Sequence, residues 1–275
     1  MFWNSKININ NGNSYKIYNI DCIPTIKTQI LGIFMWKMRV LFLKDLWNLF
    51  FPDLCCGCHK QLTRNETLLC VHCRHDLPFA GLSNLKENSL ERAFYGRLPI
   101  TSATALFTFH KKGKIQQLIH LLKYQNRQDI GVFMGTLLSR ELLESDRFKD
   151  IDLVLPVPLH PKQFKKRGYN QLTLFGKEMA KNLKCPYEEK ILIRTASAKT
   201  QTKSRRTDRF RNTSLSFEVT DCSLLENKHV LLVDDVITTG ATMEACCSAL
   251  LKTKNVQLSI AAIACPQEYS IWTLS

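Results

Sequence analysis

Two adjacent carboxylates, Asp234 and Asp235, follow four apolar residues and precede a hydroxyl-rich turn in the sequence VLLVDDVITTGAT, which spans 230–242. A carboxylate accepts two O–H bonds, so vicinal sugar hydroxyls are natural partners for this pair. The N–H groups of the turn and of a following helix can bind a phosphate dianion, and Gly240 lets the backbone close tightly around it. A D-D pair alone would also fit an ordinary turn with exposed aspartates. The whole pattern favours a sugar-phosphate site.

Four cysteines form a second constellation. Cys55 and Cys58, then Cys70 and Cys73, make two C-x-x-C pairs separated by 11 residues. This spacing is typical of a tetrahedral thiolate site of the zinc-ribbon kind, and it predicts one structural Zn2+. Cys56 could replace Cys55, and three histidines (His59, His72 and His75) are within reach, but Cys55 alone makes the standard spacing with Cys58. Disulfides are the less favoured alternative.

Basic residues concentrate in one part of the chain. Between residues 160 and 211 there are 15 Lys and Arg against 4 Asp and Glu, an excess of 11 within a formal net charge of +14. Such a stretch points to an anionic partner, either the phosphates of a small molecule or a nucleic-acid backbone. A solvated basic surface is the alternative for most single residues.

Composition excludes several classes of protein. Hydrophobic residues make up 45% and charged residues 23% of 275 residues, as in a globular chain that can bury a core. The 11 cysteines are scattered apart from the two pairs, which is unlike a secreted disulfide framework and indicates a reducing cytoplasm. The most apolar stretch, 30–54, contains Lys37, Arg39, Lys44 and Asp45, so no membrane span is expected.

Alternating elements predict an α/β fold with a parallel sheet whose faces are covered by helices. We expect strands at 101–109, 151–155, 191–194, 229–233 and 256–264, and helices at 114–124, 129–143, 170–183 and 241–251. An amphipathic helix is expected from Met38 to Pro52, a polar linker over 80–98, and loops over 156–168 and 196–211. Residues 1–37 differ in composition and are expected to be disordered or a non-native extension. The expected domains are therefore 38–80 and 99–265.

The thirteen residues 230–242 resemble the fingerprint of the type I phosphoribosyltransferases, and the predicted fold class is theirs. The resemblance implies that Asp234 and Asp235 bind the ribose hydroxyls of phosphoribosyl pyrophosphate (PRPP) with Mg2+ as cofactor. It implies a pyrophosphate loop and a mobile loop at the two basic segments, with Arg167 as the first choice for the pyrophosphate and Lys199 and Lys203 as candidates on the mobile loop. The predicted 5-phosphate site comprises Val236, Ile237, Thr238, Thr239, Gly240, Ala241 and Thr242.

Three features in this order resemble the ComF family over residues 38–265: the four-cysteine segment, LIHLLKYQ at 118–125, and PVPLHPKQFKKRGYNQ at 156–171 before the D-D pair. The leading 37 residues and Cys56 depart from it. The resemblance implies a role in the uptake of transforming DNA and leaves the acceptor of ribose phosphate open. Two hypotheses follow: an enzyme that displaces pyrophosphate from PRPP, or a non-catalytic module that binds single-stranded DNA or an uptake helicase and keeps a sensory or relic pocket.

Overall fold

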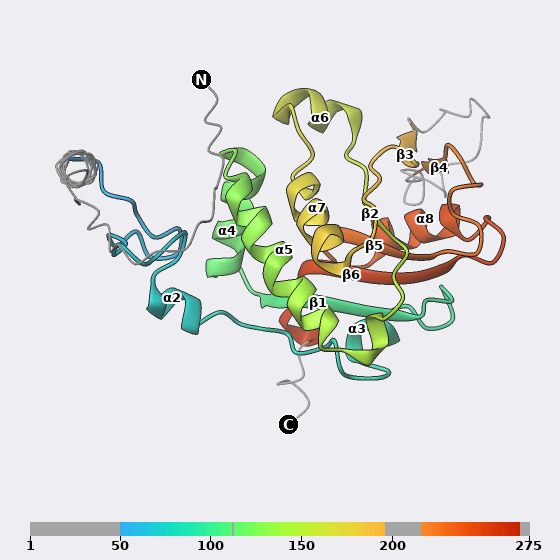
Figure 1. Ribbon diagram of the computed structural model, residues 1–275, viewed down its shortest axis with the longest axis horizontal. Helices are drawn as coiled ribbons and strands as arrows, with labels where there is room; N and C mark the ends of the chain where they lie inside the picture. Colours follow the sequence, from blue (N-terminus) through green and yellow to red (C-terminus); the bar gives the residue numbers. More distant parts are fainter. Residues whose placement is uncertain (1–49, 112, 196–215, 270–275) are drawn as a thin grey trace, which may run out of the picture. The chain divides into compact units, whose positions relative to one another are not determined.

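A four-stranded parallel sheet forms the centre of the fold in this computed structural model, which describes residues 50–111, 113–195 and 216–269 (Figure 1). Its strand order is β1-β6-β5-β2. The bounds are β1 Ser102–Phe109, β2 Leu153–Pro156, β5 His229–Val236 and β6 Gln257–Pro266. β5 and β6 are buried over almost their whole lengths, as expected for parallel strands covered on both faces.

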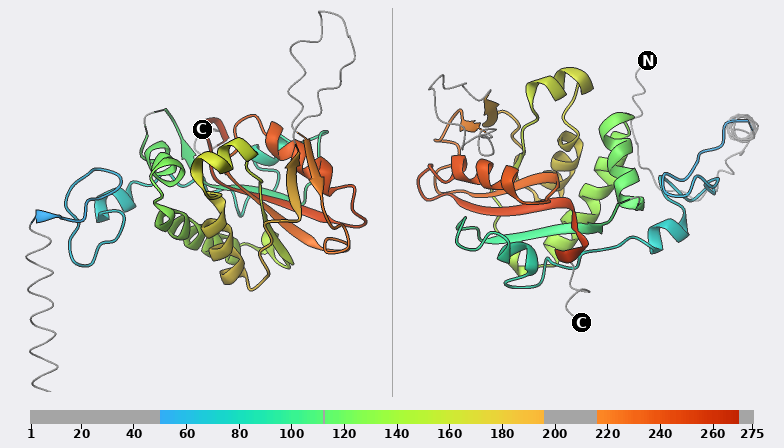
Figure 2. Two further views of the ribbon diagram at one scale, coloured as in Figure 1. Left: turned by 90° about the horizontal axis from the view of Figure 1, so that it is seen from above. Right: turned by 180° about the vertical axis from the view of Figure 1, so that it is seen from behind.

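The crossover direction explains how helices cover both faces. The connection from β1 to β2 runs across the sheet one way, and the connection from β5 to β6 runs back the other way. Right-handed crossovers therefore place the helices of these two connections on opposite faces. The first face carries α4 (Lys114–Tyr124), α5 (Gln128–Leu143) and α7 (Leu172–Leu183), and the second carries α8 (Ala241–Leu250) (Figure 2).

Residues 80–98 were expected to be a polar linker, and this prediction is wrong. Leu82, Leu90 and Phe94 have no exposed surface. The short helix α3 (Ser89–Arg92) is capped by Asn88, whose side-chain amide also donates to the Ala103 carbonyl of β1 at 2.9 Å. The segment is therefore packed into the core beside β1.

The predicted pyrophosphate loop contains a helix that the sequence analysis missed. α6 spans Pro161–Arg167, begins at the His160 cap and ends at Gly168, whose φ is 77°. None of its residues is buried. It therefore carries no hydrophobic period, and only its cap residues signal it.

The strand predicted at 191–194 exists but lies outside the parallel sheet. β3 (Leu192–Thr195) pairs antiparallel with β4 (Ser216–Val219) in a separate two-stranded sheet. The helix expected between Met38 and Pro52 and the extension 1–37 lie almost wholly outside the described residues. In the part of the chain that is described, no helix is long and apolar enough to cross a bilayer.

A compact cysteine-rich segment precedes the core. It contains the short helix α2 (Val71–His75), whose amino end is capped by Cys70. The Gln117 side chain on α4 donates to the Cys56 carbonyl at 2.9 Å, which joins this segment to the first face of the sheet.

Candidate functional site

The turn that the sequence predicts to bind a phosphate lies between β5 and α8, at the carboxyl edge of the central sheet. β5 ends at Val236, three residues longer than predicted, and its two carboxylates are the last polar groups of the strand. Thr238 and Thr239 are exposed, and α8 starts at Ala241 with no side-chain cap on its amino end. Free N–H groups at the first turn of a helix are suited to an anion.

Gly240 is required at this turn for two separate reasons. Its φ is 76°, in the left-handed region that side chains disfavour. A Cβ built there would lie 2.7 Å from Cε1 of Phe94, which is fully buried beneath the turn. Phe94, which belongs to the segment 80–98 that was expected to be a linker, therefore packs directly beneath the turn.

The backbone of Ile237 is already engaged. Its N–H donates to the Ala264 carbonyl at 3.0 Å, and its side chain is buried. The Ala241 N–H lies 3.4 Å from the Thr239 hydroxyl oxygen, which accepts from it. Of the predicted 5-phosphate residues, those from Thr238 to Thr242 are thus the ones arranged around the start of the helix.

Asp235 is buried and held by two side chains from other elements. Lys123 Nζ at the end of α4 lies 2.8 Å from Oδ1, and Gln171 Nε2 donates to Oδ2 at 2.5 Å. Gln171 in turn accepts from Arg167 at 2.7 Å. A continuous chain of contacts therefore links α6 and α4 to the carboxylate.

Asp234 has no cation of its own among the ion pairs of the described residues. Its Oδ1 accepts the Asp235 N–H at 2.7 Å. Burial and the neighbouring charge of Asp235 raise the pKa of Asp234 above its ordinary range. Two adjacent carboxylates with such different surroundings are a common feature of functional sites.

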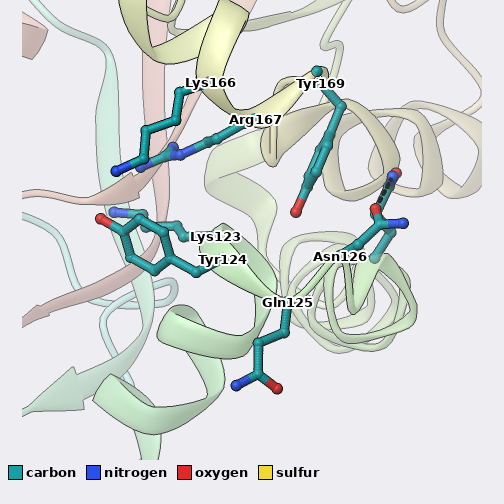
Figure 3. A pocket seen from close by; sticks show the side chains of 9 residues that line it. Lys123, Tyr124, Gln125, Asn126, Lys166, Arg167 and Tyr169 are labelled. Carbon is teal, nitrogen blue, oxygen red and sulfur yellow. Dashed lines mark hydrogen bonds between the residues drawn. The ribbon is translucent and has the colours of Figure 1, made fainter.

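Arg167 lies on the last turn of α6 instead of an open loop. Its guanidinium carbon is 5.1 Å from the centre of the Tyr124 ring. A cavity of about 490 Å3 lies between the ends of α4 and α6, and Lys123, Tyr124, Lys166 and Arg167 are among the residues that line it (Figure 3). Lys199 and Lys203 lie outside the described residues.

The four predicted metal ligands come together. The Sγ atoms of Cys55, Cys58, Cys70 and Cys73 all lie within 4.8 Å of one another, and those of Cys58 and Cys70 are 3.6 Å apart. Cys55 Sγ accepts from the Cys70 N–H at 3.3 Å and from the Gly57 N–H at 3.4 Å. Burial opposes ionisation of Cys55, but these N–H donors lower its pKa to about 6. Four convergent thiols with such donors fit a tetrahedral metal ion.

Cys56 does not belong to the cysteine cluster. It is buried, and burial raises the pKa of its thiol. The histidines near the cluster are also outside it, and His59 Nε2 contacts the Gln117 amide at 2.9 Å.

Lys123 and Gln171 are the residues that sequence reasoning missed. Both stand inside motifs quoted for the family resemblance, LIHLLKYQ and RGYNQ. Their distance of 112 and 64 residues from Asp235 hides the contact, because only the packing of α4 and α7 on the sheet brings them to β5.

Comparisons with known proteins agree with this arrangement. The family model described as "Phosphoribosyl transferase domain" matches residues 173–268. The DNA utilization protein YhgH of Escherichia coli K12 is 30% identical over 141 residues, which is 50% of this chain and 61% of that relative. Competence protein F of Haemophilus influenzae is 28% identical over 207 residues, 72% of this chain and 84% of the relative. The chain thus spans about three fifths of the YhgH proteins that it matches.

Among solved structures, the glutamine PRPP amidotransferase of B. subtilis has a TM-score of 0.36 at 18% identity, covering 52% of this chain and 30% of that one. An adenine phosphoribosyltransferase has a TM-score of 0.33 at 16% identity, covering 55% and 76%. The chain thus contains a segment that matches the phosphoribosyltransferase domain model, and it is similar to a DNA utilization protein and to a competence protein, with a four-cysteine cluster before the parallel sheet.

Proposed function

We propose that this protein binds PRPP with Mg2+ at the β5–α8 turn. The observation that carries the proposal is the exposed, hydroxyl-rich turn with left-handed Gly240 that opens α8, a few residues after two carboxylates at the edge of a parallel sheet. This arrangement separates a phosphate site from a hydroxyl-binding site by a few residues. It supports a ligand that carries a phosphate next to a ribose.

Transfer of ribose phosphate would use the residues around this turn. The N–H groups of 238–242 hold the 5-phosphate, and the Asp234 carboxylate accepts hydrogen bonds from the ribose hydroxyls. Arg167 and Lys166 line one cavity together with Lys123, which supports assigning them to stabilise the charge on departing pyrophosphate, and Lys199 and Lys203 are assigned to the same task from sequence. Mg2+ bound with PRPP supplies further charge neutralisation.

Calorimetric titration with Mg-PRPP tests the assignment. Asp234→Asn keeps the acceptor for the Asp235 N–H and removes the charge, so it should weaken binding about tenfold or more without unfolding the domain. Glu226→Gln is the control, because Glu226 is exposed before β5. Asp235→Asn is a less specific test, since it also breaks contacts with Lys123 and Gln171. Equal affinity of wild type and Asp234→Asn would refute the proposal.

We also propose that the protein acts on single-stranded DNA in the cell. In this proposal the cysteine-rich segment, residues 55–73, is a docking surface for DNA or for an uptake helicase. The names of the relatives, a DNA utilization protein and a competence protein, support this role. The structural support is α6, whose Lys162, Lys165 and Lys166 are all exposed on one short helix. A polyanion fits such a surface better than a single small ligand does.

Fluorescence polarisation with single-stranded DNA at two salt concentrations measures this binding. Replacing Lys162 and Lys165 together by Ala should weaken binding and reduce the salt slope by about 1.4, because about 0.7 counterions are released per neutralised phosphate of a single strand. PRPP should compete if the same basic surface serves both ligands. Absence of DNA binding at low salt, together with pyrophosphate release from PRPP, would leave a metabolic enzyme and refute the DNA role.

A further inference from the structure

Three of the four candidate metal ligands are directly followed by a residue that contacts α4, α5 or the turn between them. These residues are Cys56, His59 and Arg74, which come after Cys55, Cys58 and Cys73. A small metal-binding segment takes its structure from the closed set of ligands. Closing the four thiols around a metal ion therefore also fixes the residues by which the segment holds these two helices.

Gln117, in the middle of α4, holds the first pair of ligands. Its side-chain amide donates to the Cys56 carbonyl at 2.9 Å and lies 2.9 Å from Nε2 of His59. One glutamine side chain thus joins α4 to the residues that follow Cys55 and Cys58.

The helix α2 at the end of the segment makes a second set of contacts. The guanidinium carbon of Arg74 lies 5.3 Å from the centre of the Phe133 ring on α5. Asp76, which follows α2, pairs at 2.9 Å with Lys114 on the first turn of α4. Exposed contacts of this kind contribute little stability one by one, but together they fix where the segment lies on α4 and α5.

Arg127 extends these contacts to the turn between α4 and α5. Its guanidinium interacts with the buried side chain of Cys56, which gives a structural role to a cysteine that is not among the metal ligands. The residues on either side of it, Asn126 and Gln128, line the cavity beside Lys123 (Figure 3). The segment is thus joined to the same turn that forms a wall of the candidate site.

We propose that Gln117 and Arg127 are positioning residues through which the metal-bound cysteine-rich segment holds Lys123 in place, so that a metal ion in the cysteine cluster and a ligand beside Lys123 strengthen each other's binding. Lys123 stands between the two positioning residues in sequence, on the last turn of α4, and its Nζ lies 2.8 Å from Asp235. The inference deepens the proposed function and rests on it, because the ligand whose affinity changes is Mg-PRPP. Such coupling is reciprocal, since both ligands favour the same arrangement of the protein.

Hydrogen exchange on the full chain tests the positioning without any ligand. The zinc-loaded protein is compared with protein depleted by a zinc-selective chelator, and exchange is followed at 118–128 and, as an internal reference, over α8 on the other face of the sheet. Loss of zinc should speed exchange about tenfold at 118–128 and leave α8 within about twofold. Equal exchange at 118–128 in the two forms would overturn the inference.

Calorimetric titration of the same two forms with Mg-PRPP measures the coupling. We expect an affinity about tenfold lower after zinc is removed, within the usual range for coupled sites. Competition with a chromogenic zinc chelator, with and without Mg-PRPP, gives the reciprocal quantity. Zinc affinity should rise about tenfold when Mg-PRPP is present, because the two factors must be equal.

Gln117→Ala separates the contact from the metal site, because all four cysteines remain and the variant should still hold about one zinc per chain. The coupling factor should fall to about threefold or less, since the amide that joins α4 to Cys56 and His59 is gone. Cys56→Ala tests the contact with Arg127 in the same way. Gln257→Ala, at the exposed amino end of β6, is the matched control and should behave as wild type.

The outcomes separate this inference from the proposed function. If Mg-PRPP binds equally well with and without zinc, the coupling is refuted and the proposed function stands. Full tenfold coupling in both Gln117→Ala and Cys56→Ala would refute the two positioning residues. If zinc removal changes exchange at 118–128 but Mg-PRPP binds to neither form, the proposed function falls, while the positioning of the turn by the segment is upheld.

Discussion

Replacing Asp234 by Asn is expected to stabilise the protein while it weakens ligand binding. Burial and the charge of Asp235 raise the pKa of Asp234 to about 8 in the folded state, against 3.8 ordinarily. The folded state thus holds a proton that the unfolded chain has already released. Stability is lost as the pH rises from about 4 towards 8, and the loss is complete above pH 8. Asn carries no such charge and avoids the loss.

The magnitude follows from the difference in pKa. About four pKa units correspond to an upper limit of about 6 kcal/mol. Asp234 retains partial contact with solvent, which reduces the penalty, so we expect a gain of about 2 kcal/mol for Asp234→Asn at pH 8.5. At pH 5.5 the stability gained by Asp234→Asn should be about 2.5-fold smaller. This pH lies only about two fifths of the way from the unfolded pKa of 3.8 to the folded pKa of about 8, so less of the stability of the wild type has been lost.

Urea unfolding followed by circular dichroism at both pH values measures the effect, with Glu226→Gln as the control whose stability should equal that of wild type at each pH. A gain of about 2 kcal/mol corresponds to roughly 4–8 °C in Tm for a protein of this size. The reasoning is refuted if Asp234→Asn is less stable than wild type at pH 8.5, or if its gain is the same at both pH values.

Three further predictions concern Gly240 in the turn, Lys123 beside Asp235, and the cysteine cluster. Gly240→Ala should lower the free energy of unfolding by about 2–4 kcal/mol, since it adds left-handed strain and a clash with Phe94; urea unfolding as stable as wild type would contradict it. Lys123→Met should lower it by about 2 kcal/mol at pH 8 by leaving the buried Asp235 carboxylate unpaired, and a stability that rises instead would show that the ion pair is dispensable. Elemental analysis should find about one zinc per chain in wild type and none in Cys58→Ser, so a full equivalent in the variant would exclude Cys58 as a ligand.

The sequence predicted correctly those parts of the fold whose signals lie within a few residues of one another: the helix α4, the turn at 238–242 and the cysteine cluster. α4 begins and ends at the expected residues because its apolar positions, Ile115, Leu118, Ile119 and Leu122, recur at helical spacing and are all buried. The turn at 238–242 was predicted because its glycine and threonine hydroxyls act on the backbone of the same short segment, so the signal is local. The cysteine cluster was predicted because its four ligands are close in sequence, and the spacing of the two C-x-x-C pairs is typical of a four-thiolate metal site.

The failures share a different cause, which is dependence on distant contacts. Phe94 lies between Ala93 and Tyr95 in a segment that was expected to be a linker, and nothing nearby in sequence shows that it lies under Gly240. α6 buries no residue, so the periodicity that identifies helices is absent from it. β3 was placed in the parallel sheet because a short apolar run does not specify its partner, which turned out to be β4. Pairing and burial at long range are properties of the folded chain.

The Lys123–Asp235 ion pair explains how two adjacent carboxylates can stand beside a phosphate site. Both would repel an anionic ligand if both were free and charged. Lys123 pairs with Asp235 at 2.8 Å, and burial together with the charge of Asp235 raises the pKa of Asp234, so both effects reduce the negative charge beside the proposed phosphate site. Under the proposed function, a ligand bound with Mg2+ would bring positive charge that favours the ionised form of Asp234, and the carboxylate would then be a stronger acceptor for ribose hydroxyls. Lys123, the lysine in LIHLLKYQ, thus pairs with the second carboxylate of the D-D pair. α4 is therefore part of the candidate site, although Lys123 lies 112 residues before Asp235 in the sequence.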